Sequence, residues 1–391
     1  MLPYSNSSLS TEASEFLLNC FVRSPSWQHW LSLPLSLLFL LAMGANTTLL
    51  ITIQLEASLH EPMYYLLSLL SLLDMVLCLT VIPKVLAIFW FDLRTISFSA
   101  CFLQMFIMNN FLSMESCTFL VMAYDRYVAI CKPLHYPSII TNQFVSRALV
   151  FILARNTFLT APIPILSARL HYCGRNIIEN CICANLSVSK LSCGNITLNK
   201  IYQLFLAWTL LGSDLILIFL SYIFILRAVL RLNTRETAAK ALSTCGSHFI
   251  LILFFSTILL VFVFTHLAKK KVSPDIPVLL NVLHHVIPAA LNPIVYGVRT
   301  QEIKQGIWKL LRKGSDSRKQ LYSCCSPRRI LKITIEKQGL RCRNKVLIFF
   351  LFLPSDMNCA VSSYSEAHPS SYHSMVSWQR QRIKMYNLSS C

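Results

Sequence analysis

The chain has 391 residues, of which 55% are hydrophobic and only 13% are charged, and its mean hydropathy is +0.56. This composition is too apolar for an ordinary soluble protein, and the apolar residues fall in long runs, which predicts a helical protein that crosses a membrane several times. A formal net charge of +18 is compatible with nucleic-acid binding, but much of the excess lies after Lys313 and not on a folded basic face, so we exclude that function. The 15 cysteines contain no Cys-x-x-C pair, which argues against a metal cluster.

Residues 1–26 are polar and contain the glycosylation motif Asn6-Ser7-Ser8, which favours an extracellular position for this end of the chain. Such a motif also occurs often by chance. No basic start followed by an apolar core is present, so we expect no cleavable signal peptide. The first membrane helix would then act as the insertion signal.

Seven apolar stretches follow, each near the roughly 20 residues that a helix needs to cross a bilayer. The sequence therefore predicts an all-α membrane protein, a seven-transmembrane bundle over residues 27–298, with helices at 27–53, 63–89, 101–130, 146–167, 200–230, 238–267 and 276–298. Lys and Arg are enriched on the side that would be cytoplasmic, although Lys269, Lys270 and Lys271 oppose this orientation. The glycosylation motifs and a cysteine-rich loop favour an outer N-terminus.

The cysteine-rich loop lies between residues 169 and 199 and holds Cys173, Cys181, Cys183 and Cys193, while Cys101 stands at the outer start of the third stretch. Disulfides persist on the oxidising side of a membrane, so this loop should lie outside. The pairing does not follow from spacing alone. Two more glycosylation motifs in the loop begin at Asn185 and Asn195.

Asp125 and Arg126 are adjacent where the third stretch meets polar sequence. The carboxylate can hold the guanidinium in a charge-assisted hydrogen bond, and the guanidinium becomes a donor for a new partner if this helix end opens. The simpler alternative is a solvated helix end, because charges are common at membrane boundaries.

Asp74 and Glu115 are carboxylates well inside apolar helices, and Asn292 lies inside the last span. Ionisable groups within a membrane are candidate functional residues, and three oxygen-bearing side chains are suited to a cation. Alternatively, the carboxylates are protonated and only hydrogen-bond neighbouring helices. Asp214 is a third acid in the membrane, without an evident basic partner.

Several longer motifs occur in a fixed order along the chain. They are Gly44-x-Asn46, Pro62-Met63-Tyr64-Tyr65, Met122-Ala123-Tyr124-Asp125-Arg126-Tyr127, Ser221-Tyr222, Lys240-Ala241-Leu242-Ser243-Thr244-Cys245 and Pro288-Ala289-Ala290-Leu291-Asn292-Pro293-Ile294-Val295-Tyr296. Together they resemble the olfactory receptors, a branch of the rhodopsin-like G-protein-coupled receptors, from about residue 17 to residue 313. Phe89-Trp90-Phe91 and Met114-Glu115-Ser116 resemble the class I, or fish-like, branch.

The resemblance implies a plasma-membrane receptor that binds a small volatile odorant in its outer half and activates a heterotrimeric G protein of the stimulatory type, which raises cAMP. It implies disulfides from Cys101 to Cys183 and from Cys173 to Cys193, with Cys181 left over, and a possible sodium ion at Asp74, Glu115 and Asn292. The residues implied in G-protein coupling and switching are Asp125, Arg126, Tyr127, Tyr222, Lys240, His248, Asn292, Pro293 and Tyr296.

The ligand site should lie between helices in the outer half, since such sites are concave and mostly apolar. On the third helix, one face carries Met108, Asn109, Leu112 and Ser113. From later helices the resemblance adds Leu206, Leu210, Leu259, Leu260, Val263, Val282 and His285. Only a few of these predicted ligand residues are polar, which favours a small, weakly polar ligand over an amine or a peptide. The alternative for most of these residues is plain helix packing.

Residues 299–313 alternate apolar and basic side chains at helical spacing, which predicts an amphipathic helix on the membrane surface. Residues 314–391 carry no resemblance and are basic and Ser-rich, so a disordered tail is expected. The sequence shows no nucleophile–base pair of the kind that would indicate an enzyme. A transporter or channel is the alternative function, but the two halves of the chain show no inverted repeat.

Overall fold

The computed structural model describes residues 15–21, 26–231, 246, 249–254, 257, 273 and 275–324. The chain divides into two compact units, Met1–Arg318 and Lys319–Cys391, and nearly all described residues belong to the first. Most of the predicted sixth span, at 238–267, lies outside the described residues, as do residues 325–391 of the predicted tail.

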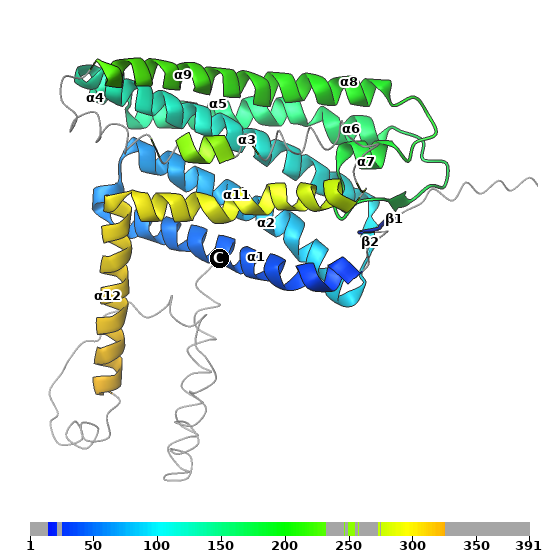
Figure 1. Ribbon diagram of the computed structural model, residues 1–391, viewed down its shortest axis with the longest axis horizontal. Coiled ribbons are helices and arrows are strands. Elements are labelled where there is room, and N and C mark those ends of the chain that lie inside the picture. Colours follow the sequence, from blue (N-terminus) through cyan, green and yellow to red (C-terminus); the bar gives the residue numbers. More distant parts are fainter. Residues whose placement is uncertain are drawn as a thin grey trace, which may run out of the picture. The chain divides into compact units, whose positions relative to one another are not determined.

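Six helical segments of the described residues are long and apolar enough to cross a membrane, and they correspond to six of the seven predicted spans (Figure 1). They are α1 (Ser26–Leu55), α2 (Pro62–Phe91), α3 (Phe98–Cys131), α5 with α6 (Asn142–Thr160 and Pro162–Ala168), α8 with η3 and α9 (Thr197–Leu206, Ala207–Gly212 and Ser213–Leu230), and α11 (Asp275–Arg299). The segment η3 is a π-helical turn inside the fifth membrane helix. Short helices in the connections are η1 (Ala57–Leu59), η2 (Pro133–His135), α4 (Tyr136–Ile139) and α7 (Asn185–Ser189).

Local sequence explains where several of these helices begin. Pro62 opens α2, where a missing backbone N–H has no cost. Ser97 and Thr141 cap α3 and α5, because each hydroxyl accepts a hydrogen bond from a backbone N–H three residues later, at 3.3 Å and 3.2 Å. Pro162 begins α6 and divides the predicted fourth span into two helices.

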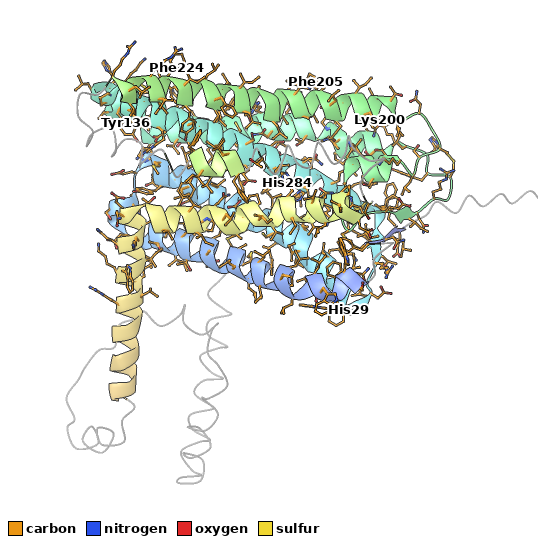
Figure 2. All side chains as sticks on the ribbon, viewed as in Figure 1. His29, Tyr136, Lys200, Phe205, Phe224 and His284 are labelled. Carbon is orange, nitrogen blue, oxygen red and sulfur yellow. A yellow bond between two sulfur atoms is a disulfide. The ribbon has the colours of Figure 1, made fainter. Side chains whose placement is uncertain are left out.

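The bundle has an apolar exterior and a partly polar interior. Leu33, Leu37 and Leu40 on α1 are 66%, 59% and 64% exposed, and the labelled Phe205 and Phe224 point outward from α8 and α9 (Figure 2). In contrast, Asn46 and Asn156 are fully buried. This arrangement suits a lipid environment, where exposed leucine has no cost and polar groups need partners inside the protein.

α3 lies at the centre of the bundle and packs against α2, α5, α6 and α9. The two largest clusters of buried apolar side chains among the described residues lie in the interior. The outer cluster includes Val81, Met105, Met108, Leu206, Leu210 and Val282. The inner cluster includes Leu70, Phe119, Met122, Ile218 and Tyr296.

A small sheet lies at the end of the bundle that carries the disulfides, and we call this the outer end because disulfides persist on the oxidising side. Its strand order is β2–β1–β3, in which β1 (Glu15–Leu18) pairs antiparallel with β2 (Thr95–Ser97) and parallel with β3 (Ile177–Ile178). Part of the polar N-terminal segment is therefore a strand that joins the loop before α3 to the cysteine-rich loop.

At the inner end, α12 (Gln301–Cys324) follows α11 after Thr300. The helix begins near the predicted start at 299 and continues beyond the predicted end at 313, so helical backbone occupies the first residues of the predicted tail. Ile303 is fully buried, and Lys309 Nζ forms an ion pair with Glu56 Oε1 at 2.8 Å. A Cβ atom at Gly306 would lie 2.7 Å from a methyl carbon of Thr52, so only glycine permits this close approach of α12 to α1.

Candidate functional site

The inner end of α3 carries the predicted switch pair in a closed arrangement. Arg126 donates from Nε and Nη2 to Asp125 Oδ2, at 2.9 Å and 2.6 Å. The other carboxylate oxygen of Asp125 accepts a hydrogen bond from the hydroxyl of Tyr136, at 2.9 Å. Asp125 is fully buried, so both of its oxygens are used inside the protein. A solvated helix end is therefore not what the structure contains.

Tyr136 was not predicted as a site residue, although it follows the Asp125 motif closely in the sequence. It opens α4, which lies beyond the end of α3, and folds back toward the carboxylate. Burial and the neighbouring Asp125 carboxylate raise the pKa of the Tyr136 hydroxyl above its ordinary value. Tyr136 therefore stays protonated and remains a hydrogen-bond donor at physiological pH.

Of the other predicted switch residues, Tyr127, Tyr222 and Tyr296 lie at the same inner end. Tyr296 is fully buried in the inner cluster, and the ring of Tyr222 lies 5.4 Å from the ring of Phe249. Tyr127 packs edge-on against Phe224 of α9, with 6.1 Å between ring centroids. Pro293 lines a groove of about 440 Å³ between α1 and α11 on the outside of the bundle. Lys240 and His248 lie outside the described residues.

Asp74, Glu115 and Asn292 converge in the middle of the bundle from α2, α3 and α11. The Asn292 amide nitrogen lies 3.2 Å and 3.0 Å from the two oxygens of Asp74 and 3.3 Å from Glu115 Oε1. All three side chains are buried. Carboxylate oxygens suit a hard cation, so two of the three side chains fit sodium, whereas the amide presents its nitrogen to the carboxylates. A proton shared between the carboxylates fits the same contacts.

Asp214 has a basic partner, contrary to the expectation that it lacks one. Arg155 of α5 donates from Nη1 to Asp214 Oδ2 at 3.1 Å, and its Nη2 lies 3.0 Å from Oδ1. Nη2 also donates to the backbone oxygen of Thr209 at 2.9 Å and to Ser213 Oγ at 3.3 Å. The position of Arg155 in the middle of the apolar stretch 146–167, away from its ends, was the signal in the sequence that could have indicated an acidic partner.

The predicted ligand residues come together only in part. Met108, Leu206, Leu210 and Val282 are all buried in the outer cluster, from α3, α8, η3 and α11. Leu112 packs instead against the inner cluster. Leu259, Leu260 and Val263 lie outside the described residues.

The polar groups of this region bond to the backbone of their own helices. Asn109 donates to the Met105 carbonyl and Ser113 donates to the Asn109 carbonyl, each at 2.8 Å. His285 is buried, and its Nδ1 lies 2.7 Å from the Asn281 carbonyl oxygen. These bonds leave the surroundings of the outer cluster weakly polar.

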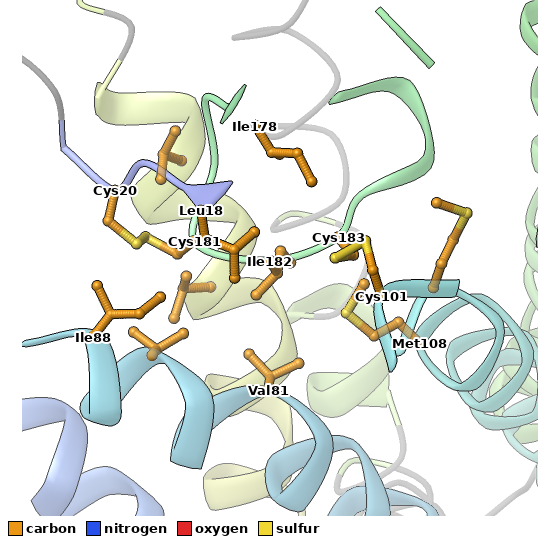
Figure 3. Close-up of a cluster of buried hydrophobic side chains, with 14 of the residues drawn as sticks. Leu18, Cys20, Val81, Ile88, Cys101, Met108, Ile178, Cys181, Ile182 and Cys183 are labelled. Atoms are coloured by element: carbon orange, nitrogen blue, oxygen red, sulfur yellow. A yellow bond between two sulfur atoms is a disulfide. The ribbon is translucent and has the colours of Figure 1, made fainter. Parts of the chain in front are cut away.

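The cysteine-rich loop covers the outer cluster and is joined to other segments by two disulfides and a hydrogen bond to α3 (Figure 3). Disulfides join Cys101 to Cys183 and Cys173 to Cys193, the pairs that the resemblance implies. Cys181, which the sequence left over, is joined to Cys20 at the end of the N-terminal strand. The backbone N–H of Cys183 also donates to Gln104 Oε1 of α3, at 3.0 Å. No local signal in the polar N-terminal segment indicated the role of Cys20.

The structure disfavours glycosylation at Asn185. Its side chain is buried, its Oδ1 accepts from Ser167 Oγ at 2.7 Å, and its Nδ2 donates to Gln203 at 2.8 Å. A glycan on this nitrogen would have to displace those partners, so we expect this motif to be unmodified in the folded chain. Asn195 is exposed and stays a predicted site, and Asn6 lies outside the described residues.

The family of the chain follows from its similarity to known proteins. A sequence model described as "Olfactory receptor" matches residues 35–314. The chain belongs to the olfactory receptor family. It is 80% identical to human olfactory receptor 56A3 over 314 aligned residues, and this alignment covers 80% of this chain and 100% of that relative. It is 40% identical over 307 residues to human olfactory receptor 52K1, which covers 78% of this chain and 97% of that relative.

The fold of this olfactory receptor is that of rhodopsin. The crystal structure of squid rhodopsin superposes with a TM-score of 0.61 at 15% identity, over 81% of this chain and 93% of that chain. The predicted seven-helix fold, the receptor function through a G protein, the non-enzymatic nature and the multi-pass plasma-membrane location are thus confirmed. The alternative of a transporter or channel is not favoured.

Proposed function

We propose that this olfactory receptor binds a small, weakly polar volatile molecule in the outer half of its bundle and then activates a stimulatory G protein that raises cAMP. The observation that carries the ligand class is the outer cluster, in which Met108, Leu206, Leu210 and Val282 from three membrane helices are buried together. A small apolar ligand gains affinity by burying its surface among such side chains. The nearby amide, hydroxyl and imidazole groups are engaged with backbone carbonyls, and the predicted ligand residues include no carboxylate that could pair with an amine.

The inner end supplies the coupling step of this proposal. Asp125 holds Arg126 in the resting arrangement, and Tyr136 holds Asp125. A ligand changes the receptor only if it binds one of two helix arrangements more tightly than the other. In the arrangement that the odorant prefers, the contacts among Asp125, Arg126 and Tyr136 must be broken. Arg126 would then donate to the G protein, with Tyr127, Tyr222 and Tyr296 repacking beside it. The supporting observation is that Arg126, despite its charge, is only 9% exposed.

The carboxylates in the middle of the bundle could hold a cation or a proton. If sodium binds, Asp74 and Glu115 would ligate it through their oxygens, and its single positive charge would neutralise one of the two buried carboxylates. Asp74→Asn should then make odorant responses insensitive to the sodium concentration. Responses of the unmutated receptor that do not change with sodium would favour the shared proton.

Residues 15–313 should suffice for these steps, because the outer cluster, the three side chains Asp74, Glu115 and Asn292, and the contacts of Asp125 with Arg126 and Tyr136 all lie within them. The helix at 299–313 would support the inner end through the contacts of Ile303 and Lys309. We also keep the class I assignment as a prediction.

The experiment compares the full-length chain with a chain that ends after Lys313 in cells with a cAMP reporter. The probes are hexanal, octanal, methyl octanoate and acetophenone, with octylamine as the charged comparison. Responses of both chains to at least one neutral probe, at equal surface density, are expected. A response to octylamine alone would contradict the ligand class, and a response without cAMP would contradict the G-protein class.

A further inference from the structure

The fifth membrane helix is interrupted by the π-helical turn η3 beside the outer cluster. A π-helix is rare, is usually confined to a single turn and often occurs at a functional site. Thr209 lies within this turn, and its carbonyl oxygen accepts a hydrogen bond from Arg155 Nη2 at 2.9 Å. The hydroxyl of Ser213 donates to the same carbonyl. Side-chain donors therefore bind the irregular part of this helix.

Arg155 reaches this carbonyl because Asp214 holds the other side of its guanidinium. The two contacts with the Asp214 carboxylate measure 3.1 Å and 3.0 Å and use both carboxylate oxygens. A planar guanidinium can bind a carboxylate and a carbonyl at once, whereas an ammonium is a single point of charge. The Asp214 side chain is 1% exposed and the Arg155 side chain is 17% exposed. Ser116 and Cys117 of α3 are further neighbours of the pair.

Helix packing alone does not account for this pair. Replacing a buried ion pair by apolar side chains of similar volume is often neutral or stabilising, and in a membrane an unpaired charge is costly. What apolar side chains cannot replace is the hydrogen bond from Arg155 to the Thr209 carbonyl. The Phe151 ring, whose centroid lies 6.0 Å from the Arg155 guanidinium carbon, also covers the charge.

The turn that Arg155 binds carries ligand residues. Leu206 directly precedes η3, and Leu210 lies inside it, one residue after Thr209. Both are buried in the outer cluster with Met108 and Val282. A π-turn contains one residue more than an α-turn, and each residue rotates a helix by about 100°. If η3 became α-helical, Leu206 and Leu210 could not both keep their present directions.

We propose that Arg155 and Asp214 are positioning residues of the odorant site: their ion pair holds the π-helical turn and thereby sets which side chains of the fifth helix face the ligand. This proposal rests on the function proposed above. The pair touches no ligand itself. It determines potency and the preference among odorants through Leu206 and Leu210.

The test compares R155K and the neutral double variant R155M/D214N with the unmutated receptor. R147K is the matched control, because Arg147 lies on the same helix and is exposed. Concentration–response curves for hexanal, octanal, methyl octanoate and acetophenone are measured with the cAMP reporter at matched surface density. We expect R155K and the double variant to lose about tenfold or more in potency and to change the rank order of the probes, while R147K does neither. A structural role alone would lower surface density and leave potency and rank order unchanged, and that result would overturn the proposal.

A second measurement needs no ligand. Hydrogen-exchange mass spectrometry on purified receptor should show faster exchange in residues 207–214 for R155K than for the unmutated chain or R147K. Equal exchange in all three would overturn the proposal. If the unmutated receptor answers none of the probes, the proposed ligand class fails, and the exchange measurement still decides whether Arg155 holds the turn.

Discussion

Tyr136→Phe should raise signalling in the absence of odorant. The Tyr136 hydroxyl is the donor to Asp125 Oδ1, at 2.9 Å, and Arg126 occupies the other oxygen. Phenylalanine keeps the ring and removes this hydrogen bond. If the bond exists only in the resting arrangement, its loss destabilises that arrangement alone and shifts the population toward the coupling state.

The size of the shift follows from the charge and burial of the partners. A hydrogen bond to a charged group contributes about 1.5–3 kcal/mol, and the lower figure is appropriate because Tyr136 is only partly buried. About 1.4 kcal/mol corresponds to a tenfold change in an equilibrium constant. If roughly 1% of resting receptors are in the coupling state, Tyr136→Phe should bring this to about 10%. Asp125→Asn removes the charge as well and should have a larger effect.

The assay is ligand-free cAMP, normalised to surface receptor. Tyr124→Phe is the matched control, because Tyr124 is next to Asp125 on α3, is 42% exposed and makes ring contacts with Tyr127 and Phe144. Ligand-free signalling should rise in Tyr136→Phe and stay unchanged in Tyr124→Phe. If both variants match the unmutated receptor, the cluster stabilises the fold without acting as a switch, and our reasoning is refuted.

Three further predictions concern the two ends of the bundle. Arg126→Ala should abolish the cAMP response while surface expression and odorant binding are retained; equal loss of surface protein would mean that the residue only supports folding. Cys20→Ser, Cys181→Ser and the double variant should all expose the N-terminal segment to limited proteolysis to the same degree, because each removes the same covalent bond; a larger effect in the double variant would contradict the pairing. Asn195→Gln should increase gel mobility to the extent that glycosidase treatment does, whereas Asn185→Gln should not change the glycan content; a glycan lost with Asn185 would contradict its burial.

The membrane spans could be predicted because the bilayer imposes a length and an apolar character on every crossing helix. A span is recognised from the mean hydropathy of about 20 residues, and this mean changes little when one of them is charged. Arg155 lies within a strongly apolar stretch, and its partner Asp214 is 59 residues away in the sequence. Nothing local in either segment specifies that they meet, since helix rotation and neighbour choice depend on the whole bundle.

Contacts made by connecting segments were the other part that the sequence did not indicate. Tyr136 reaches Asp125 only because the chain turns through η2 after α3. Cys20 reaches Cys181 because β1 adds to a sheet with two distant segments. A strand of four residues within polar sequence has no periodic signal, so its pairing with the cysteine-rich loop required the structure.

Three groups of buried charged residues adjoin α3. Asp125 and Arg126 lie at its inner end, Glu115 meets Asp74 and Asn292 in its middle, and Ser116 and Cys117 adjoin Arg155 and Asp214. The free energy of an apolar helix in lipid depends little on its rotation about its own axis, because lipid tails are as apolar as leucine. Polar partners therefore fix the rotation of α3 relative to α2, α5, α9 and α11. A ligand that rotates or shifts α3 from the outer cluster must strain or exchange these contacts, and this is a physical route from the odorant site to Arg126.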